Sequence, residues 1–262
     1  MCMEQDTLKA PRDFPFNTRA AAFARLHVAR RQRCADVTIK VELHTHTSAD
    51  PVDRILHDAG RLIDRASRLG YGALAVTLHD RWHDPAPWHD RAIARGITLI
   101  PAIERTIEGA HVLLINVPRE AEKVRTFEDL RAFKASTNAL VVAPHPFYPI
   151  PSAMGSRLET HGDLVDALEI SSLHARGIDF NRRAVEWAAA HGKPLVGNTD
   201  LHLLSQLGTT YSLVEAATAE ADVICQAIRM GRVQVVTRRL GWVRAAWYFT
   251  VMAGGSIGRH HE

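Results

Sequence analysis

Residues 41–47 read Val-Glu-Leu-His-Thr-His-Thr, a short apolar run that ends in two histidines separated by one residue. On an extended backbone, side chains two residues apart point to the same side, so His44 and His46 would face one spot. Two neutral imidazoles that converge in this way are typical ligands of a divalent transition metal. An isolated His-x-His sequence also fits a surface or hydrogen-bonded pair, so the rest of the chain decides between these interpretations.

The composition sets wide limits on the fold and the partners. With 262 residues and 46% hydrophobic content, the chain is long enough for one α/β domain of barrel size or for two small domains. Its 32 basic and 29 acidic residues nearly balance, which neither favours nor excludes nucleic acid as a partner. The cysteines Cys2, Cys34 and Cys225 have no Cys-x-x-Cys spacing, which indicates free thiols in a reducing cytosol. The N-terminus lacks an apolar signal-peptide core and no apolar run reaches membrane-spanning length, so we expect a cytoplasmic protein without a membrane span.

Short apolar runs alternate with segments of helical periodicity along most of the chain. The runs are predicted as strands at 37–43, 73–77, 97–103, 111–116, 139–143, 166–170 and 193–197, with a further run at 233–237. Apolar strands separated by helices indicate parallel βα units in a sheet that is buried on both faces. About seven such units favour a distorted (β/α)7 TIM-like barrel. An open doubly wound sheet is the alternative, but the chain has no Gly-rich phosphate loop at a strand-to-helix turn.

This alternation divides the chain into three parts. Residues 1–36 are predicted as a partly helical N-terminal extension, whose arginines are interpreted as a solvated helix face. Residues 37–238 are predicted as the barrel domain, and residues 239–262 as a helical C-terminal tail.

Most candidate metal ligands fall where predicted strands end. His44 and His46 follow the first strand, His79 the second, Glu104 the third, His145 the fifth, and Asp200 and His202 the seventh. The carboxyl ends of barrel strands meet at one face, where the following loops build the active site. His111 begins a strand, but a tight pairing of 98–103 with 111–116 would return it beside Glu104. The histidines outside this pattern are interpreted as surface residues: His27, His57, His161, His191, His260 and His261.

Together these motifs resemble the PHP (polymerase and histidinol phosphatase) domain family over residues 37–238. The resemblance is carried by Glu42-Leu43-His44-Thr45-His46-Thr47, Thr77-Leu78-His79-Asp80, Glu104 with His111, Pro144-His145-Pro146 and Asn198-Thr199-Asp200-Leu201-His202. It implies a PHP-type distorted barrel, a site with two or three divalent ions, usually Mn, Zn or Fe, and hydrolysis of phosphoric esters.

The resemblance also implies a ligand set. Its members are His44, His46, Asp50, His79, Glu104, His111, His145, Asp200 and His202. Glu104 matches the carboxylate that usually bridges two metals. Asp50 lies one residue nearer to the first histidine than the family's Ser-Asp-Gly places its aspartate, so either Asp50 or Asp53 could reach the site, and Asp50 is preferred. Leu78 departs from the family, which usually has Asp or Asn before the histidine of the second motif.

The residue types favour the same chemistry. Carboxylates with imidazoles suit Mn, Fe or Zn. Metals about 3.5–4 Å apart can share a bridging hydroxide that attacks a phosphoric ester, so no Ser or Cys nucleophile is required. The catalytic candidates are His79, His202 and Asp50, with either histidine as the acid for the leaving alcohol. The candidate substrate contacts are Arg81, Arg105 and Arg176 for phosphate oxygens, and His174.

The leading hypothesis is a metal-dependent phosphatase or phosphodiesterase that acts on a small phosphorylated metabolite or nucleotide. An amidohydrolase also opens with His-x-His, but it usually has a lysine between its metals, and Lys123, Lys134 and Lys193 lie on predicted helices or before a strand. A catalytically weakened barrel that serves as a metal-binding or regulatory module is the non-enzymatic alternative, favoured by Leu78 and the irregular Asp50 loop. Nucleic acid is a further substrate class that no basic-aromatic stripe favours, and the sequence sets no oligomeric state.

Overall fold

The computed structural model describes residues 36–175 and 177–257. The extension predicted at residues 1–36 therefore lies outside the described residues except for Asp36, and so do Cys2, Cys34 and Arg176. The tail predicted from residue 239 is described as far as Ile257.

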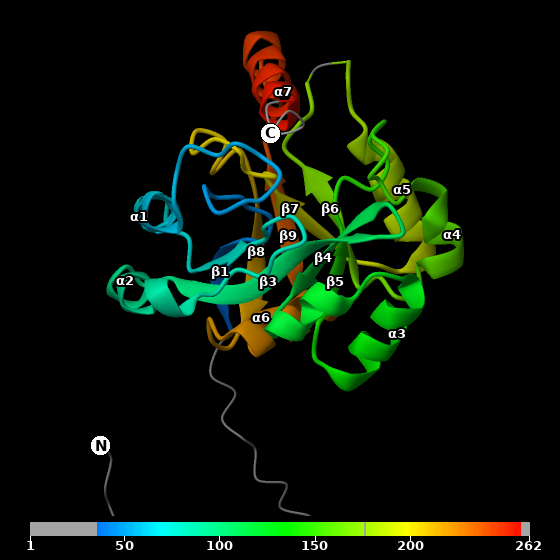
Figure 1. The fold of residues 1–262 in the computed structure, drawn as a ribbon, viewed down its shortest axis with the longest axis horizontal. Coiled ribbons are helices and arrows are strands. Elements are labelled where there is room, and N and C mark those ends of the chain that lie inside the picture. Colours follow the sequence, from blue (N-terminus) through cyan, green and yellow to red (C-terminus); the bar gives the residue numbers. More distant parts are fainter. Residues whose placement is uncertain (1–35, 176, 258–262) are drawn as a thin grey trace, which may run out of the picture. The chain divides into compact units, whose positions relative to one another are not determined.

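A nine-stranded sheet with the order β7-β6-β5-β4-β3-β2-β1-β8-β9 forms the centre of the structure (Figure 1). The strands are β1 (Val37–Glu42), β2 (Ala73–Val76), β3 (Thr98–Ile107), β4 (Ala110–Ile115), β5 (Leu140–Ala143), β6 (Ala167–Ser171), β7 (Leu195–Asn198), β8 (Thr210–Ala216) and β9 (Val233–Thr237). Two parallel stretches, β1-β2-β3 and β5-β6-β7, are joined through the antiparallel strand β4. The antiparallel strands β8 and β9 extend the sheet on the other side of β1.

Helices surround this sheet. They are α1 (Ala59–Arg68), α2 (His89–Ala94), α3 (Phe127–Ser136), α4 (Leu158–His161), α5 (Asn181–His191), α6 (Ala221–Arg229) and α7 (Trp242–Ile257), with 3₁₀ turns at Ala86–Trp88, Arg119–Lys123 and Gly155–Arg157. A capping box opens α3, since Thr126 and Asp129 each accept a hydrogen bond from the other's backbone amide. Among the described residues, no helix is long and apolar enough to cross a membrane.

The amino end of the strands is closed by apolar packing. Helix α6 places Ile224 and Ile228 in one buried cluster with Ile39, Ile100 and Leu140, which lie on the strands near that end. Figure 1 shows α6 at the lower end of the sheet, away from the loops that follow the strands. Hydrophobic side chains fill this end of the barrel. The polar cluster that the sequence predicts therefore lies at the other end, on the carboxyl-end face.

The two edges of the sheet meet at Gly197 in β7. A Cβ atom there would lie 2.8 Å from the carbonyl oxygen of Tyr211 in β8 and 2.8 Å from a methyl group of Val235 in β9. The Ser212 hydroxyl accepts a hydrogen bond from the Gly197 amide at 2.9 Å and donates one to its carbonyl at 3.2 Å. The sheet is therefore a nearly closed, distorted barrel, and the predicted fold class is confirmed.

Backbone hydrogen bonds continue this seam towards the carboxyl ends of the strands. The Leu201 amide donates to the carbonyl of His44 at 3.1 Å, and the His46 amide donates to the carbonyl of Leu201 at 3.0 Å. The first and last of the predicted ligand motifs are thus paired directly through their backbones.

Two strands of the structure differ from the prediction. Strand β8 was not predicted, because Thr210–Ala216 alternates buried with more exposed side chains instead of forming an apolar run. Strand β3 was predicted to end before Glu104 but continues to Ile107, since it pairs with β4 as an antiparallel hairpin with Thr106 opposite His111. Glu104 therefore projects from the interior of a strand. The hairpin itself is the pairing that the sequence suggested.

The contact at Gly197 predicts a cost for any side chain there. We expect Gly197→Ala to lower the free energy of unfolding by about 1–3 kcal/mol, because the added methyl group overpacks against backbone that cannot easily move. Urea unfolding followed by circular dichroism measures this change. Gly241→Ala is the matched control, since a Cβ atom at Gly241 meets nothing within 4 Å. Equal stabilities of the two variants would contradict the close seam.

Candidate metal centre

Four buried side chains converge at the carboxyl-end face. The Nε2 atom of His44 lies 3.3 Å from Glu104 Oε2 and 3.2 Å from Asp200 Oδ1. The Nε2 atom of His46 lies 3.4 Å and 3.2 Å from the same two oxygens. The histidines follow β1, Glu104 comes from β3, and Asp200 follows β7 with a positive φ of 49° that turns the chain back towards β1.

This arrangement fits a divalent ion. Both Nε2 atoms are buried and have no hydrogen-bond partner in the structure. An unpaired buried polar atom costs free energy, so such atoms call for a ligand. Around a tetrahedral ion with bonds of 2.0–2.1 Å, neighbouring ligand atoms are about 3.3–3.4 Å apart. The observed spacings of 3.2–3.4 Å match this geometry.

The outer nitrogens of these histidines are held by carboxylates. Glu169 in β6 places Oε2 2.8 Å from His44 Nδ1. Asp50 places Oδ2 2.9 Å from His46 Nδ1 and 3.1 Å from His79 Nδ1. A carboxylate on the outer nitrogen fixes the tautomer and leaves the inner nitrogen free to bind a metal. Asp50 therefore lies behind two histidines, although its oxygens are also close enough to His46 and His79 to form a candidate ligand group with them.

Glu104 lies between two groups of histidines. Its Oε2 atom faces His79 Nε2 at 3.2 Å in addition to the pair from β1. Its Oε1 atom faces His111 Nδ1 at 2.8 Å and His145 Nε2 at 3.6 Å. Burial raises the pKa of Glu104, but the surrounding imidazoles outweigh burial and hold this pKa well below its usual value. An ionised carboxylate with one oxygen turned to each group is suited to bridging two ions.

His202 faces hydrogen-bond acceptors at both ring nitrogens. Its Nε2 atom lies 2.9 Å from Asp53 Oδ2, and its Nδ1 atom lies 2.9 Å from the backbone carbonyl oxygen of Asp200. Burial lowers the pKa of His202, but Asp200 and Asp53 more than offset burial, so the pKa is raised. Both aspartates of the loop after His46 thus reach the cluster, and the choice between Asp50 and Asp53 was unnecessary.

Leu78, the departure from the family pattern, is explained by packing. Its side chain is buried in an apolar cluster with Leu62 and Ile63 of α1. The adjacent His79 receives its polar support from Asp50, which accepts a hydrogen bond from the His79 amide at 3.0 Å as well as facing its ring. The histidine is therefore oriented without a polar residue at position 78.

The predicted substrate residues are less well placed. Arg105 is buried within β3, donates to the Val124 carbonyl at 2.7 Å and pairs with Asp80, so the structure places its guanidinium against acceptors of the protein itself. Arg81 is exposed and donates to the Ala49 carbonyl at 3.2 Å, and Arg176 lies outside the described residues.

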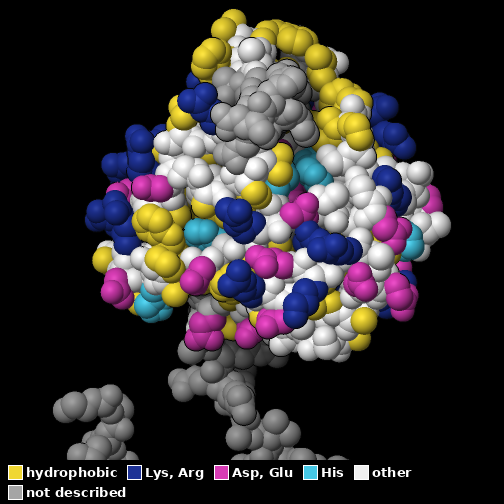
Figure 2. All heavy atoms as spheres, viewed as in Figure 1, with side chains coloured by type: hydrophobic (Ala, Val, Ile, Leu, Met, Phe, Trp, Pro, Cys, Tyr) yellow, Lys and Arg dark blue, Asp and Glu magenta, His cyan; other side chains and the backbone are white. Residues whose placement is uncertain are grey.

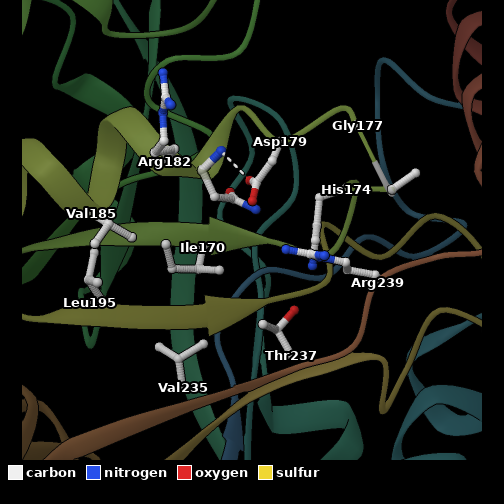
Figure 3. Close-up of a pocket in the computed structure, with 12 residues that line it drawn as sticks. Ile170, His174, Gly177, Asp179, Arg182, Val185, Leu195, Val235, Thr237 and Arg239 are labelled. Atoms are coloured by element: carbon white, nitrogen blue, oxygen red, sulfur yellow. Dashed lines mark hydrogen bonds between the residues drawn. The ribbon is translucent and has the colours of Figure 1, made fainter.

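His174 lines a separate cavity. This cavity of about 750 Å³ lies between α5 and the strands β6, β7 and β9. Figure 3 shows His174, Thr237 and Arg239 at one end of the cavity and Val185 and Leu195 at the other. The His174 side chain is buried there, with Nδ1 3.3 Å from the Ser171 carbonyl oxygen.

Three buried polar residues of the site were not predicted. Besides Glu169, they are Asn198, which accepts from the Leu43 amide and donates to Glu169, and Glu42, which accepts from the amide and hydroxyl of Thr199. Burial raises the pKa of Glu42 to about 8 against the hydrogen bonds from Thr199. The available signal was an acidic residue within an apolar strand, as in Val41-Glu42-Leu43 and Leu168-Glu169-Ile170.

His57, predicted as a surface residue, is buried. It precedes α1, and its carbonyl accepts a hydrogen bond from the Ser48 amide at 2.7 Å, within the loop that carries Asp50 and Asp53. Burial lowers the pKa of His57 to about 4. The helical position suggested exposure, but the long loop before the helix folds over this side chain.

Comparisons with known proteins agree with this fold. A family model described as PHP-associated matches residues 179–233. No curated protein sequence matches the chain significantly. A two-domain protein from Bacteroides vulgatus, described as containing a predicted PHP-like metal-dependent phosphoesterase, is 19% identical with a TM-score of 0.63, and the match covers 83% of this chain and 70% of that one.

Two further solved structures have the same fold. PsfC from Pseudomonas syringae is 18% identical with a TM-score of 0.60, and the match covers 81% of this chain and 98% of that one. A lesion-specific endonuclease from Pyrococcus furiosus is 17% identical with a TM-score of 0.53, and the match covers 76% of this chain but only 58% of that one. At these identities the likeness shows the fold alone.

The contact between Glu169 and His44 predicts an effect on metal affinity. We expect Glu169→Gln to weaken binding of the most tightly held ion by about 10- to 100-fold, because the amide cannot support the His44 tautomer as a carboxylate does. Competition with a chromophoric chelator measures the affinity. Glu215→Gln, on the exposed side of β8, is the matched control. Unchanged affinity in Glu169→Gln would contradict the orienting role.

The buried His57 predicts a pH dependence of stability. Its pKa rises from about 4 in the folded state to about 6.5 on unfolding, so the unfolded state binds more protons between these values. Stability should therefore fall as the pH falls. When the pH is lowered from about 7 to about 5, the free energy of unfolding of the wild type should fall by about 2 kcal/mol more than that of His57→Leu. Urea unfolding of both metal-saturated proteins at the two pH values checks this difference, and parallel losses would show that His57 does not contribute.

Proposed function

We propose that this chain is a PHP-domain protein and a metal-dependent phosphoesterase that hydrolyses a phosphoric ester of a small metabolite or nucleotide. The observation that carries the proposal is the pair of buried Nε2 atoms of His44 and His46, unpaired and 3.2–3.4 Å from the carboxylates of Glu104 and Asp200. The usual chemistry of the family, and the phosphoesterase domain of the Bacteroides vulgatus protein with a similar fold, support this class of bond.

The ligands divide into groups that share Glu104. We assign His44, His46, Glu104 and Asp200 to one ion, and Glu104, His111 and His145 to a second. His79 and His202 flank His46 and remain available for a third ion or for proton transfer. Two or three ions of Mn, Zn or Fe would polarise the phosphoryl group and lower the pKa of a bound water towards neutrality.

The residues around the ligands have distinct roles in this proposal. Glu169 and Asp50 face the outer nitrogens of His44 and His46 and so direct the inner nitrogens at the ions. Asp53 and the Asp200 carbonyl favour a proton on each nitrogen of His202. The raised pKa of His202 favours its protonated form, and we assign this imidazole the general-acid role towards the leaving alcohol.

The decisive experiment combines metal analysis with an ester panel. Purified protein with added Mn(II) is assayed on phosphomonoesters, phosphodiesters and short oligonucleotides, alongside the double variant His44→Ala/His46→Ala. We expect at least one ester to be hydrolysed, and the double variant to lose about a thousandfold or more of that rate, because the ions supply several kcal/mol of transition-state stabilisation. His191→Ala, which alters an exposed histidine on α5, is the control.

The outcomes separate the alternatives. Full metal loading without hydrolysis of any ester would favour a metal-binding or regulatory module. Hydrolysis that survives the double substitution would place the active site elsewhere. Activity on oligonucleotides alone would move the substrate class to nucleic acid.

A further inference from the structure

Helix α7 leaves the barrel at the carboxyl ends of the strands. Its described side chains Ala245 and Tyr248 pack against Tyr148, Leu173 and Leu240 in a small apolar cluster. Tyr248 also donates a hydrogen bond to the Ser205 hydroxyl at 3.3 Å. Figure 1 shows α7 in red, extending beyond the ends of the strands. One face of the helix is therefore anchored to the barrel.

The opposite face of α7 is apolar and exposed. Val243 is 88% exposed, Trp247 60% and Trp242 55%. Val243 and Trp247 are four residues apart, so they share a helix face, and they are rotated away from Ala245 and Tyr248. A helix that is apolar on two faces but packed on only one lacks a partner for the other.

The charged residues on α7 and directly before it are all arginines. Residues 238–257 contain no Asp or Glu. Arg238 and Arg239 precede the helix and Arg244 lies on it, and all three are exposed. Figure 2 shows hydrophobic side chains gathered at the α7 end of the molecule, with Lys and Arg side chains on either side. Ala175 forms a β-bridge with Leu240, which precedes α7. Ile178, three residues after Ala175, is another exposed hydrophobic side chain at this end.

We propose that the exposed face of α7 is a docking surface for membranes that contain anionic lipids. Tryptophans with arginines are the combination that enters the headgroup region, where the indole and the guanidinium meet both apolar chains and phosphates. The helix would lie in the interface and not cross the bilayer, in line with its length. Pairing with a second copy is disfavoured, because it would bring together two sets of arginines with no carboxylate between residues 238 and 261. The proposal does not depend on the phosphoesterase activity.

Vesicle flotation of the full, metal-loaded chain tests this surface. We expect the protein to float with vesicles of phosphatidylcholine mixed with phosphatidylglycerol, less with phosphatidylcholine alone, and less as salt is added. The double variant Val243→Asp/Trp247→Asp should lower the partition by about tenfold or more, because both side chains would enter the interface. Both positions are exposed, so the variant should keep the wild-type melting temperature.

The control is Ile93→Asp on α2, a helix at a different part of the barrel, where the side chain is 63% exposed. This variant should bind vesicles as wild type does. Absence of binding by wild type, or equal binding by the α7 variant, would overturn the proposal. A wild-type dimer in light scattering that Val243→Asp/Trp247→Asp converts to a monomer, without vesicle binding, would instead assign the surface to a second copy.

Discussion

The structure depends on the pairing of buried carboxylates with histidine side chains at the carboxyl ends of the strands. Glu104 and Asp200 are buried among imidazoles, and Glu169 is buried directly behind one of them. An isolated buried carboxylate would be strongly unfavourable, so each must face a proton donor or a cation. Hydrogen bonds satisfy the outer nitrogens of His44 and His46, and the inner nitrogens and the oxygens of Glu104 are the atoms left over. These atoms surround the position where a divalent ion would fit.

The apolar side chains that stabilise the barrel lie at one end of it, and the candidate ligands lie at the other. At the amino end, α6 and the strand starts form an apolar plug with little polar character. At the carboxyl end, the strands β1, β3 and β6 carry the buried carboxylates of Glu42, Glu104 and Glu169. These side chains would have no polar partners in the apolar cluster at the amino end. Because the apolar end holds the strands in register, the other end can keep buried polar groups that are satisfied only by one another or by a ligand.

Much of this could be predicted from one sequence, for a physical reason. Apolar strand runs followed by ligand-type residues are local patterns, so His44, His79, His145 and Asp200 could be placed at one face without knowing any contact. Contacts across the barrel leave no such pattern. Glu169 lies 125 residues from His44, and nothing local marks its carboxylate as a partner of that imidazole. The strand at 97–103 was predicted to end too early because the end of β3 depends on its pairing with β4.

The seam between Leu201 and the strand-one motif has a kinetic consequence. His44 and His46 accept and donate the backbone hydrogen bonds that join the two ends of the barrel, and the same residues point their rings at the ligand cluster. Opening the seam would move Asp200 away from both imidazoles, so an ion held by these three side chains would be released by the same local unfolding that opens the barrel. Amide hydrogen exchange at His46 and Leu201 would then be slower when such an ion is bound.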